Sequence, residues 1–139
     1  VSALRDPGTE DDPAQPLQRI QIIKGWIDNG VQKEKVYEVA GNKDNGANVD
    51  LNTCAPVNAD KGFASLCTVW EDPDFNVAQP AFYYARVVEN PGCRWSYRQL
   101  LAAGQTCANA SSDFAAACTY PKTIQERAWT SPIWYKPAH

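Results

Sequence analysis

The sequence is short of the residues that most enzymes use for catalysis. Its 139 residues include one histidine, His139, and that histidine stands at the last position. A terminal imidazole is poorly placed for a hydrolytic triad, and a catalytic zinc site needs two or three histidines. There is no C-x-x-C pair, P-loop or G-x-G-x-x-G motif. We therefore expect no catalytic residue, metal ligand or cofactor-binding residue, although sequence alone leaves a glycosidase-like carboxylate pair open.

Other features that are missing narrow the class of protein further. No apolar run reaches the eighteen or so residues that span a bilayer, so no transmembrane segment is expected. The net charge is -3, whereas nucleic-acid-binding proteins typically carry an excess of basic residues, so we expect no nucleic-acid partner. The chain contains no methionine at all, and we therefore expect it to be part of a longer protein or a processed product.

Cysteine, in contrast, is abundant, with five residues in 139. This content favours disulfides and an oxidising compartment, so we expect a periplasmic or extracellular location. We predict one disulfide between Cys54 and Cys67, which would close the long Asn-, Asp- and Gly-rich stretch at 41–62. We predict another between Cys93 and Cys118, which lie at the two ends of one excursion between strands. The odd count then leaves Cys107 free or paired between chains.

Alternating apolar residues and turn signals predict a mainly β domain. Residues 17–28 read as a central strand, and Asp28-Asn29-Gly30 is a hairpin turn leading to a partner strand at 34–40. Further strands are expected at 63–70 and 81–89, a helix at 96–103 and a second helical turn from Ser111. We predict an antiparallel β-sandwich with one or two short helices. An immunoglobulin-like form is one version of it, although the Cys…Trp…Cys spacing of that fold is not evident.

The segment TIQERAWTSPIWY, Thr123–Tyr135, places two tryptophans, a tyrosine and two isoleucines within thirteen residues. We expect it to form a strand that buries its tryptophans and isoleucines and so organises the core. Pro132 cannot donate a ladder hydrogen bond, so it marks an edge, a bulge or a break between two short strands.

Two adjacent charges interrupt this apolar segment. Glu126 and Arg127 are neighbours in a strand and should point to opposite faces of the sheet. We expect a structural role for both, with Glu126 pairing with Arg86 first, or with Arg19 or Arg94. Arg127 is expected to stack on Trp129 or Trp95, or to meet an acidic group from another strand.

Several blocks of the sequence also carry a family resemblance. The chain resembles the C-terminal region of the bacterial domain-of-unknown-function 3604 family. The resemblance rests on RDPGT at Arg5–Thr9, PLQRIQIIKGW at Pro16–Trp26, EKVYEVA at Glu34–Ala40, CTVWEDPDF at Cys67–Phe75, AFYYARVVENPGCRWS at Ala81–Ser96, and the segment Thr123–Tyr135. It implies a parent protein whose upstream part is similar to metal-dependent phosphoesterases of the polymerase-and-histidinol-phosphatase type. That metal site would lie outside this chain.

The resemblance suggests how the chain is organised and used. Residues 1–16 would be an extended lead-in from a preceding domain, and residues 17–139 a single β-rich domain. We expect a non-catalytic structural or accessory domain that contacts the preceding domain, with assembly of several copies left open. The alternative is a binding module for a sugar or another small ligand, in which exposed aromatic residues face the ligand. Trp95, Trp129 and Trp134 are the candidates for that role.

Overall fold

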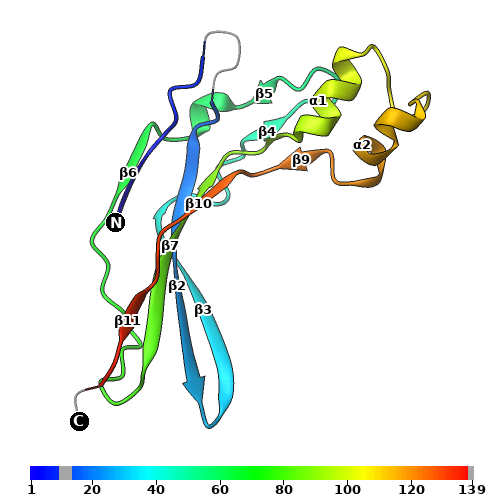
Figure 1. Ribbon diagram of the computed structural model, residues 1–139. Helices are drawn as coiled ribbons and strands as arrows, with labels where there is room; N and C mark the ends of the chain where they lie inside the picture. Colours follow the sequence, from blue (N-terminus) through cyan, green and yellow to red (C-terminus); the bar gives the residue numbers. More distant parts are fainter. Residues whose placement is uncertain (10–13, 138–139) are drawn as a thin grey trace.

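A five-stranded antiparallel sheet forms the long body of the molecule in the computed structural model, which describes residues 1–9 and 14–137 (Figure 1). Its strand order is β10-β7-β2-β3, and β11 pairs with β7 beyond the end of β10. The bounds of these strands are β2 (Leu17–Asp28), β3 (Val31–Gly41), β7 (Ala81–Glu89), β10 (Arg127–Trp129) and β11 (Ile133–Tyr135). The central position of β2 and its hairpin with β3 confirm the predictions made from the sequence.

The hairpin turn between β2 and β3 is determined by two neighbouring residues. Asn29 and Gly30 both adopt positive φ, at 49° and 80°, as the tight turn requires. Asparagine and glycine tolerate this region of backbone conformation better than other residues. Strand β7 matches its predicted bounds because Pro80 precedes it and the turn residues Asn90 and Pro91 follow it.

Each face of the main sheet has a different environment. One face, here called the covered face, carries the small sheet formed by β1 (Ser2–Leu4) and β6 (Ser65–Cys67). Leu66 of β6 packs there against Leu17 and Ile20 of β2. The 68–80 segment, here called the strap, then follows the same face down to the start of β7. The opposite face is here called the open face, because Ile27, Trp129 and Trp134 on it are mostly exposed.

A smaller unit, here called the cap, projects from one end of the sheet (Figure 1). It contains β4 (Asn48–Val49), β5 (Pro56–Val57), β8 (Gly92–Cys93), α1 (Trp95–Ala102), α2 (Ala115–Thr119) and β9 (Thr123–Ile124), with short 3₁₀ turns at Ala59–Lys61 and Ser112–Phe114. Its own core consists of Val49, Cys93, Tyr97, Leu100 and Ala117. Gly104 follows the end of α1 with a positive φ of 69°, a conformation that glycine adopts readily at helix C-termini.

The predicted class of fold is confirmed, because the molecule is mainly β with antiparallel sheets and two short helices. The second layer over the main sheet is a two-stranded ribbon, β1 with β6, which is smaller than a half of an immunoglobulin sandwich. Residues 2–4 of the expected lead-in belong to that ribbon. The strand expected at 63–70 is shorter than predicted and spans Ser65–Cys67, since the chain leaves it to become the strap.

Both predicted disulfide pairings are wrong. The bonds join Cys54 to Cys93 and Cys107 to Cys118, and Cys67 is free and exposed. Cys67 lies in β6 of the small β1–β6 sheet, whereas Cys54 packs against the core of the cap beside Cys93. The excursion after Cys93 does close on a neighbouring strand, but Thr123 rather than Cys118 lies opposite Cys93.

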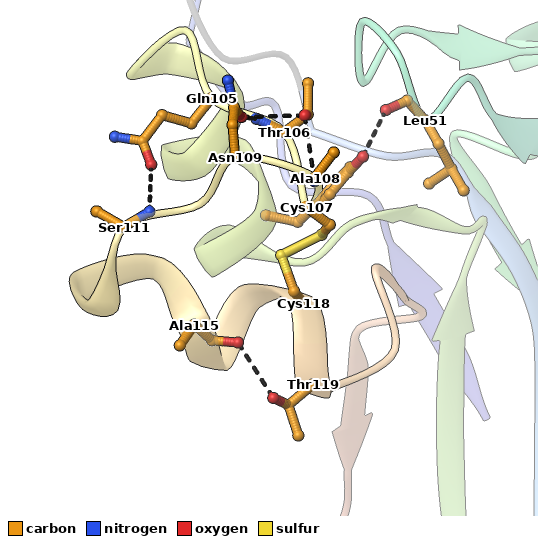
Figure 2. The surroundings of a disulfide bond; sticks show 11 residues. Leu51, Gln105, Thr106, Cys107, Ala108, Asn109, Ser111, Ala115, Cys118 and Thr119 are labelled. Atoms are coloured by element: carbon orange, nitrogen blue, oxygen red, sulfur yellow. Dashed lines mark hydrogen bonds between the residues drawn. A yellow bond between two sulfur atoms is a disulfide. The ribbon is translucent and has the colours of Figure 1, made fainter.

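The Cys107–Cys118 bond joins the loop after α1 to helix α2 (Figure 2). Side chains around it hold the same loop in place. Asn109 accepts hydrogen bonds from the backbone N–H and the hydroxyl of Thr106, and Gln105 accepts one from the backbone N–H of Ser111. This local network, together with the disulfide, orders a part of the cap that has little regular secondary structure.

Candidate functional site

The segment 123–135 forms an exposed edge of the molecule rather than the core that the sequence suggested. Trp129, Ile133 and Trp134 are 59%, 74% and 67% exposed. The reason is topological, because β10 and β11 form the outer edge of the sheet and each has only β7 beside it (Figure 1). An edge strand has no second neighbour to cover its side chains, however apolar they are.

The break within this edge was predicted correctly. Thr130, Ser131 and Pro132 separate β10 from β11, and both strands pair with the single strand β7. Thr130 fastens the break to the sheet: its hydroxyl accepts a hydrogen bond from the N–H of Ala85 at 3.0 Å, and its N–H donates to the carbonyl of Ala85 at 3.1 Å. Pro132, which lacks a donor, stands where no ladder bond is required.

Glu126 and Arg127 point to opposite faces, as expected, but the predicted partner of Glu126 is wrong. Arg127 lies opposite Val88, and the preceding residue Glu126 accepts a backbone bond from Glu89 through its carbonyl. Glu126 therefore stands on the covered face, whereas Arg86 lies on the open face opposite Gln21. Arg86 donates from Nε to Oε1 of Gln21 at 2.7 Å.

Neither charge of the Glu126–Arg127 pair makes an ion pair with another described residue. Glu126 instead lies near two further carboxylates, those of Glu89 and Asp6. Burial raises the pKa of the Glu89 carboxyl, and the charges of Glu126 and Asp6 raise it further. The edge thus carries negative charge on one side and the guanidinium of Arg127 on the other.

Residues 124–130 are here called the β10 edge. Three clefts lie around this edge. A cleft of about 470 Å³ lies between Asp6, Glu89, Trp95 and Glu126. A second, of about 410 Å³, separates the N-terminal strand from β10 and is lined by Leu4 and Trp129. The third, of about 570 Å³, lies between Pro91 and Arg94 on one side and the β10 edge on the other.

A fourth cleft, here called the β11 groove, lies at the far end of the open face. Its volume is about 570 Å³. Its residues are Gly25, Trp26, Ile27, Gln32, Lys33, Glu34, Pro80, Ala81, Phe82, Trp134, Tyr135 and Lys136. Apolar residues from β2, β7 and β11 make the floor and one wall. Polar residues of β3 and Lys136 supply the rim.

The floor of the β11 groove depends on a close contact between a glycine and an aromatic ring. Phe82 lies opposite Gly25 in the sheet register, and a Cβ atom added at Gly25 would lie 2.2 Å from Cζ of Phe82. The Phe82 ring is nearly parallel to that of Tyr84, at 8° and 6.4 Å between centroids, and is 5.2 Å from that of Trp134. The sequence did not show that Phe82 is the residue that covers Gly25, because their pairing depends on the register between β2 and β7.

The covered face contains a buried charge cluster that the sequence did not reveal. Lys24, 2% exposed, meets Oδ2 of Asp72 at 2.6 Å and donates to the carbonyl of Asp74 at 2.8 Å. The Tyr83 hydroxyl donates to Oδ2 of Asp72 at 2.7 Å, and the Tyr37 hydroxyl donates to Oδ2 of Asp74, also at 2.7 Å. The acidic Glu-Asp-Pro-Asp turn therefore anchors the strap to the main sheet.

The protonation of this cluster follows from its contacts. Burial opposes ionisation of Asp72, but hydrogen bonds from Lys24 and Tyr83 outweigh it and lower the pKa of the carboxyl. The Lys35 ammonium and the Tyr37 hydroxyl lower the pKa of Asp74. Burial and these carboxylates in turn raise the pKa values of Tyr37 and Tyr83, so both phenols stay protonated. Because every polar group has a partner, we interpret the cluster as structural.

Candidate metal ligands are not clustered among the described residues. Residues 1–9 and 14–137 contain no group of three or more His, Cys, Asp or Glu side chains placed to hold a metal ion. His139 lies outside the described residues. Within the same ranges, no helix is long and apolar enough to cross a membrane.

Comparison with known proteins gives a family but no characterised relative. The family model described as "Protein of unknown function (DUF3604)" matches residues 1–137, which is nearly the whole chain. No curated protein matches the chain. No solved structure matches it either.

Proposed function

The chain belongs to the DUF3604 family, and on that premise we propose that it is a non-catalytic accessory domain that docks through the β10 edge onto a neighbouring domain of the same protein. The observation that carries the proposal is the exposure of large apolar side chains on and around this edge. Large exposed apolar patches are uncommon on folded domains, and where they occur they usually mark an interaction surface.

The apolar side chains belong to separate elements that meet at one place. Leu4 of β1 is 82% exposed and Trp95 of α1 is 71% exposed, and both line clefts that also contain Glu126. Trp129 lines two of the three clefts. Full burial of one such side chain contributes about 1.5–3 kcal/mol, so covering three of them offers enough free energy to hold two domains together.

The backbone and the charges of β10 define the kind of partner. The outer edge of β10 has no neighbouring strand among the described residues, so a strand from another domain can extend the sheet there. Such a partner would place a basic side chain against Glu126 on the covered side and an acidic one against Arg127 on the open side. The same contacts would neutralise two charges that make no ion pair within the described part of the chain.

The parent protein and its location are part of this proposal. In this proposal the parent protein carries an upstream hydrolase domain similar to metal-dependent phosphoesterases, and the metal site of that domain lies outside this chain. The Cys54–Cys93 and Cys107–Cys118 bonds support a periplasmic or extracellular location, because disulfides persist in oxidising compartments. In this arrangement the domain shapes or stabilises the hydrolase and performs no chemistry of its own.

Hydrogen–deuterium exchange tests the docking. The exchange of residues 124–130 would be measured in the isolated chain and in a longer family protein that carries it. We expect slower exchange of this segment in the longer protein, and expect Trp129→Ala to restore the faster rate. Trp134→Ala is the matched control, because Trp134 is also mostly exposed but lies in the β11 groove. Equal exchange of residues 124–130 in both proteins would overturn the proposal.

A further inference from the structure

We infer that the β11 groove is a binding site for a neutral pyranose ring of an oligosaccharide, separate from the β10 edge and going beyond the docking function proposed above. The groove lies on the open face, at the end of the sheet away from the cap. Its volume of about 570 Å³ falls within the roughly 300–1,000 Å³ range typical of small-molecule sites.

The apolar part of the groove matches the less polar face of a sugar ring. Phe82 forms the floor, and Trp134 and Ile27 contribute exposed apolar surface beside it. Aromatic rings present a broad, flat, polarisable surface on which a ring-shaped ligand can stack. A small inorganic ion gains nothing from such a floor, so this composition selects an organic ring.

The polar part of the groove carries groups of both signs. Gln32 and Glu34 of β3 and Lys136 after β11 line the rim, together with Lys33. Ammonium groups donate hydrogen bonds, a carboxylate accepts them, and an amide does both. This mixture complements hydroxyl groups, which also donate and accept, better than it complements a ligand with a strong charge of one sign. The rim therefore favours a neutral sugar over a phosphate, a sulfate or a polycation.

The floor is held rigidly, which lowers the entropic cost of binding. Phe82 fits over Gly25, where any side chain would collide with the ring. Tyr84 and Trp134 flank the ring on neighbouring positions of the sheet. Gly25, Phe82 and Trp134 lie on paired strands rather than loops, so this part of the groove is already formed before a ligand binds.

Titration of the 139-residue chain with soluble hexasaccharides tests the inference. Cellohexaose, laminarihexaose, xylohexaose and chitohexaose would be added while tryptophan fluorescence and calorimetric heat are followed. We expect at least one of them to bind with a dissociation constant below about 1 mM. Trp134→Ala should weaken that binding at least tenfold, and Phe82→Leu should weaken it similarly.

The controls use tryptophans that are also mostly exposed but lie elsewhere. Trp95→Ala and Trp129→Ala should keep the affinity, because both residues line clefts of the β10 edge. Trp134 is mostly exposed, so its variant should fold even if Phe82→Leu does not. Failure of all four sugars to bind would overturn the inference, as would binding that survives Trp134→Ala. Binding of a proline-rich decapeptide in their place, which aromatic grooves also accept, would overturn it too.

Discussion

Lys24 and Asp72, which are 48 residues apart in the chain, meet at 2.6 Å beneath the strap with side chains only 2% and 6% exposed. Both charges are removed from water, so each depends on the other and on the surrounding hydroxyl and carbonyl groups. The pair fixes the strap to the middle of the sheet. It is the most deeply buried ion pair among the described residues.

Asp72→Asn should therefore destabilise the chain by about 3–5 kcal/mol, because it leaves the Lys24 ammonium buried without its counter-charge. Urea unfolding monitored by circular dichroism measures the loss. Removing both charges with Lys24→Met and Asp72→Leu should cost less than the single change. Lys61→Met is the control, since its ion pair with Asp60 is exposed and should contribute less than about 1 kcal/mol. A single variant as stable as this control would show that the pair is not structural.

The two disulfides should differ in their contribution to stability. The loop-entropy relation gives about 4 kcal/mol for Cys54–Cys93, with a sequence separation of 39, and about 3 kcal/mol for Cys107–Cys118, with a separation of 11. Denaturant unfolding of the paired Cys→Ala variants measures both. Alkylation without reductant, followed by peptide mapping, should label Cys67 alone. Label on Cys54 or Cys107 in the folded chain would contradict the pairing.

Gly25→Ala should destabilise the sheet by about 1–3 kcal/mol, because the new methyl group requires the Phe82 ring to move. Thermal unfolding gives the size of the effect, and a change in Trp134 fluorescence would report the movement of the ring. Gly92→Ala is the matched control, since its nearest neighbours would lie 3.6–3.8 Å from the added atom and its φ is not positive. Equal losses for the two variants would exclude a special contact at Gly25.

Glu89→Gln should stabilise the chain near neutral pH. The pKa of Glu89 is raised in the folded chain by burial, Glu126 and Asp6, so folding favours the protonated form. Stability from this group is therefore fully present below the unfolded pKa of about 4.3 and is lost as pH rises through the folded pKa. The melting temperatures of variant and parent should converge at acidic pH and separate above it. A variant that is less stable at pH 7 would contradict this sign.

The elements that the sequence predicted well are those with local signals. The 28–30 turn needs only Asn29 and Gly30 in positive φ, and β7 is bounded by its own prolines and turn residues. Helix α1 spans Trp95–Ala102, so it starts and ends one residue before the predicted helix at 96–103, and Arg94 is its N-cap residue. Local chemistry thus located β2, β7 and α1 to within one residue.

The features that the sequence did not predict depend on long-range contacts. Burial of Lys24 requires the strap, and the partner of Cys54 is decided by how β8 enters the cap. Trp129 and Trp134 are large apolar residues of the kind usually found in a core. They are exposed because β10 and β11 lie at the edge of the sheet. The segment 123–135 was expected to build the core, and the clefts beside it depend on residues from β1, β3 and β7 that no local signal connects to it.

The placement of the disulfides also has a consequence for the order in which the molecule matures. All four bonded cysteines belong to the cap or its loops, and the main sheet depends on ladder hydrogen bonds and the Lys24–Asp72 pair. Assembly of the sheet therefore needs no oxidant, whereas completion of the cap does. A chain that folds with too little oxidant would therefore have a complete main sheet and an incompletely folded cap.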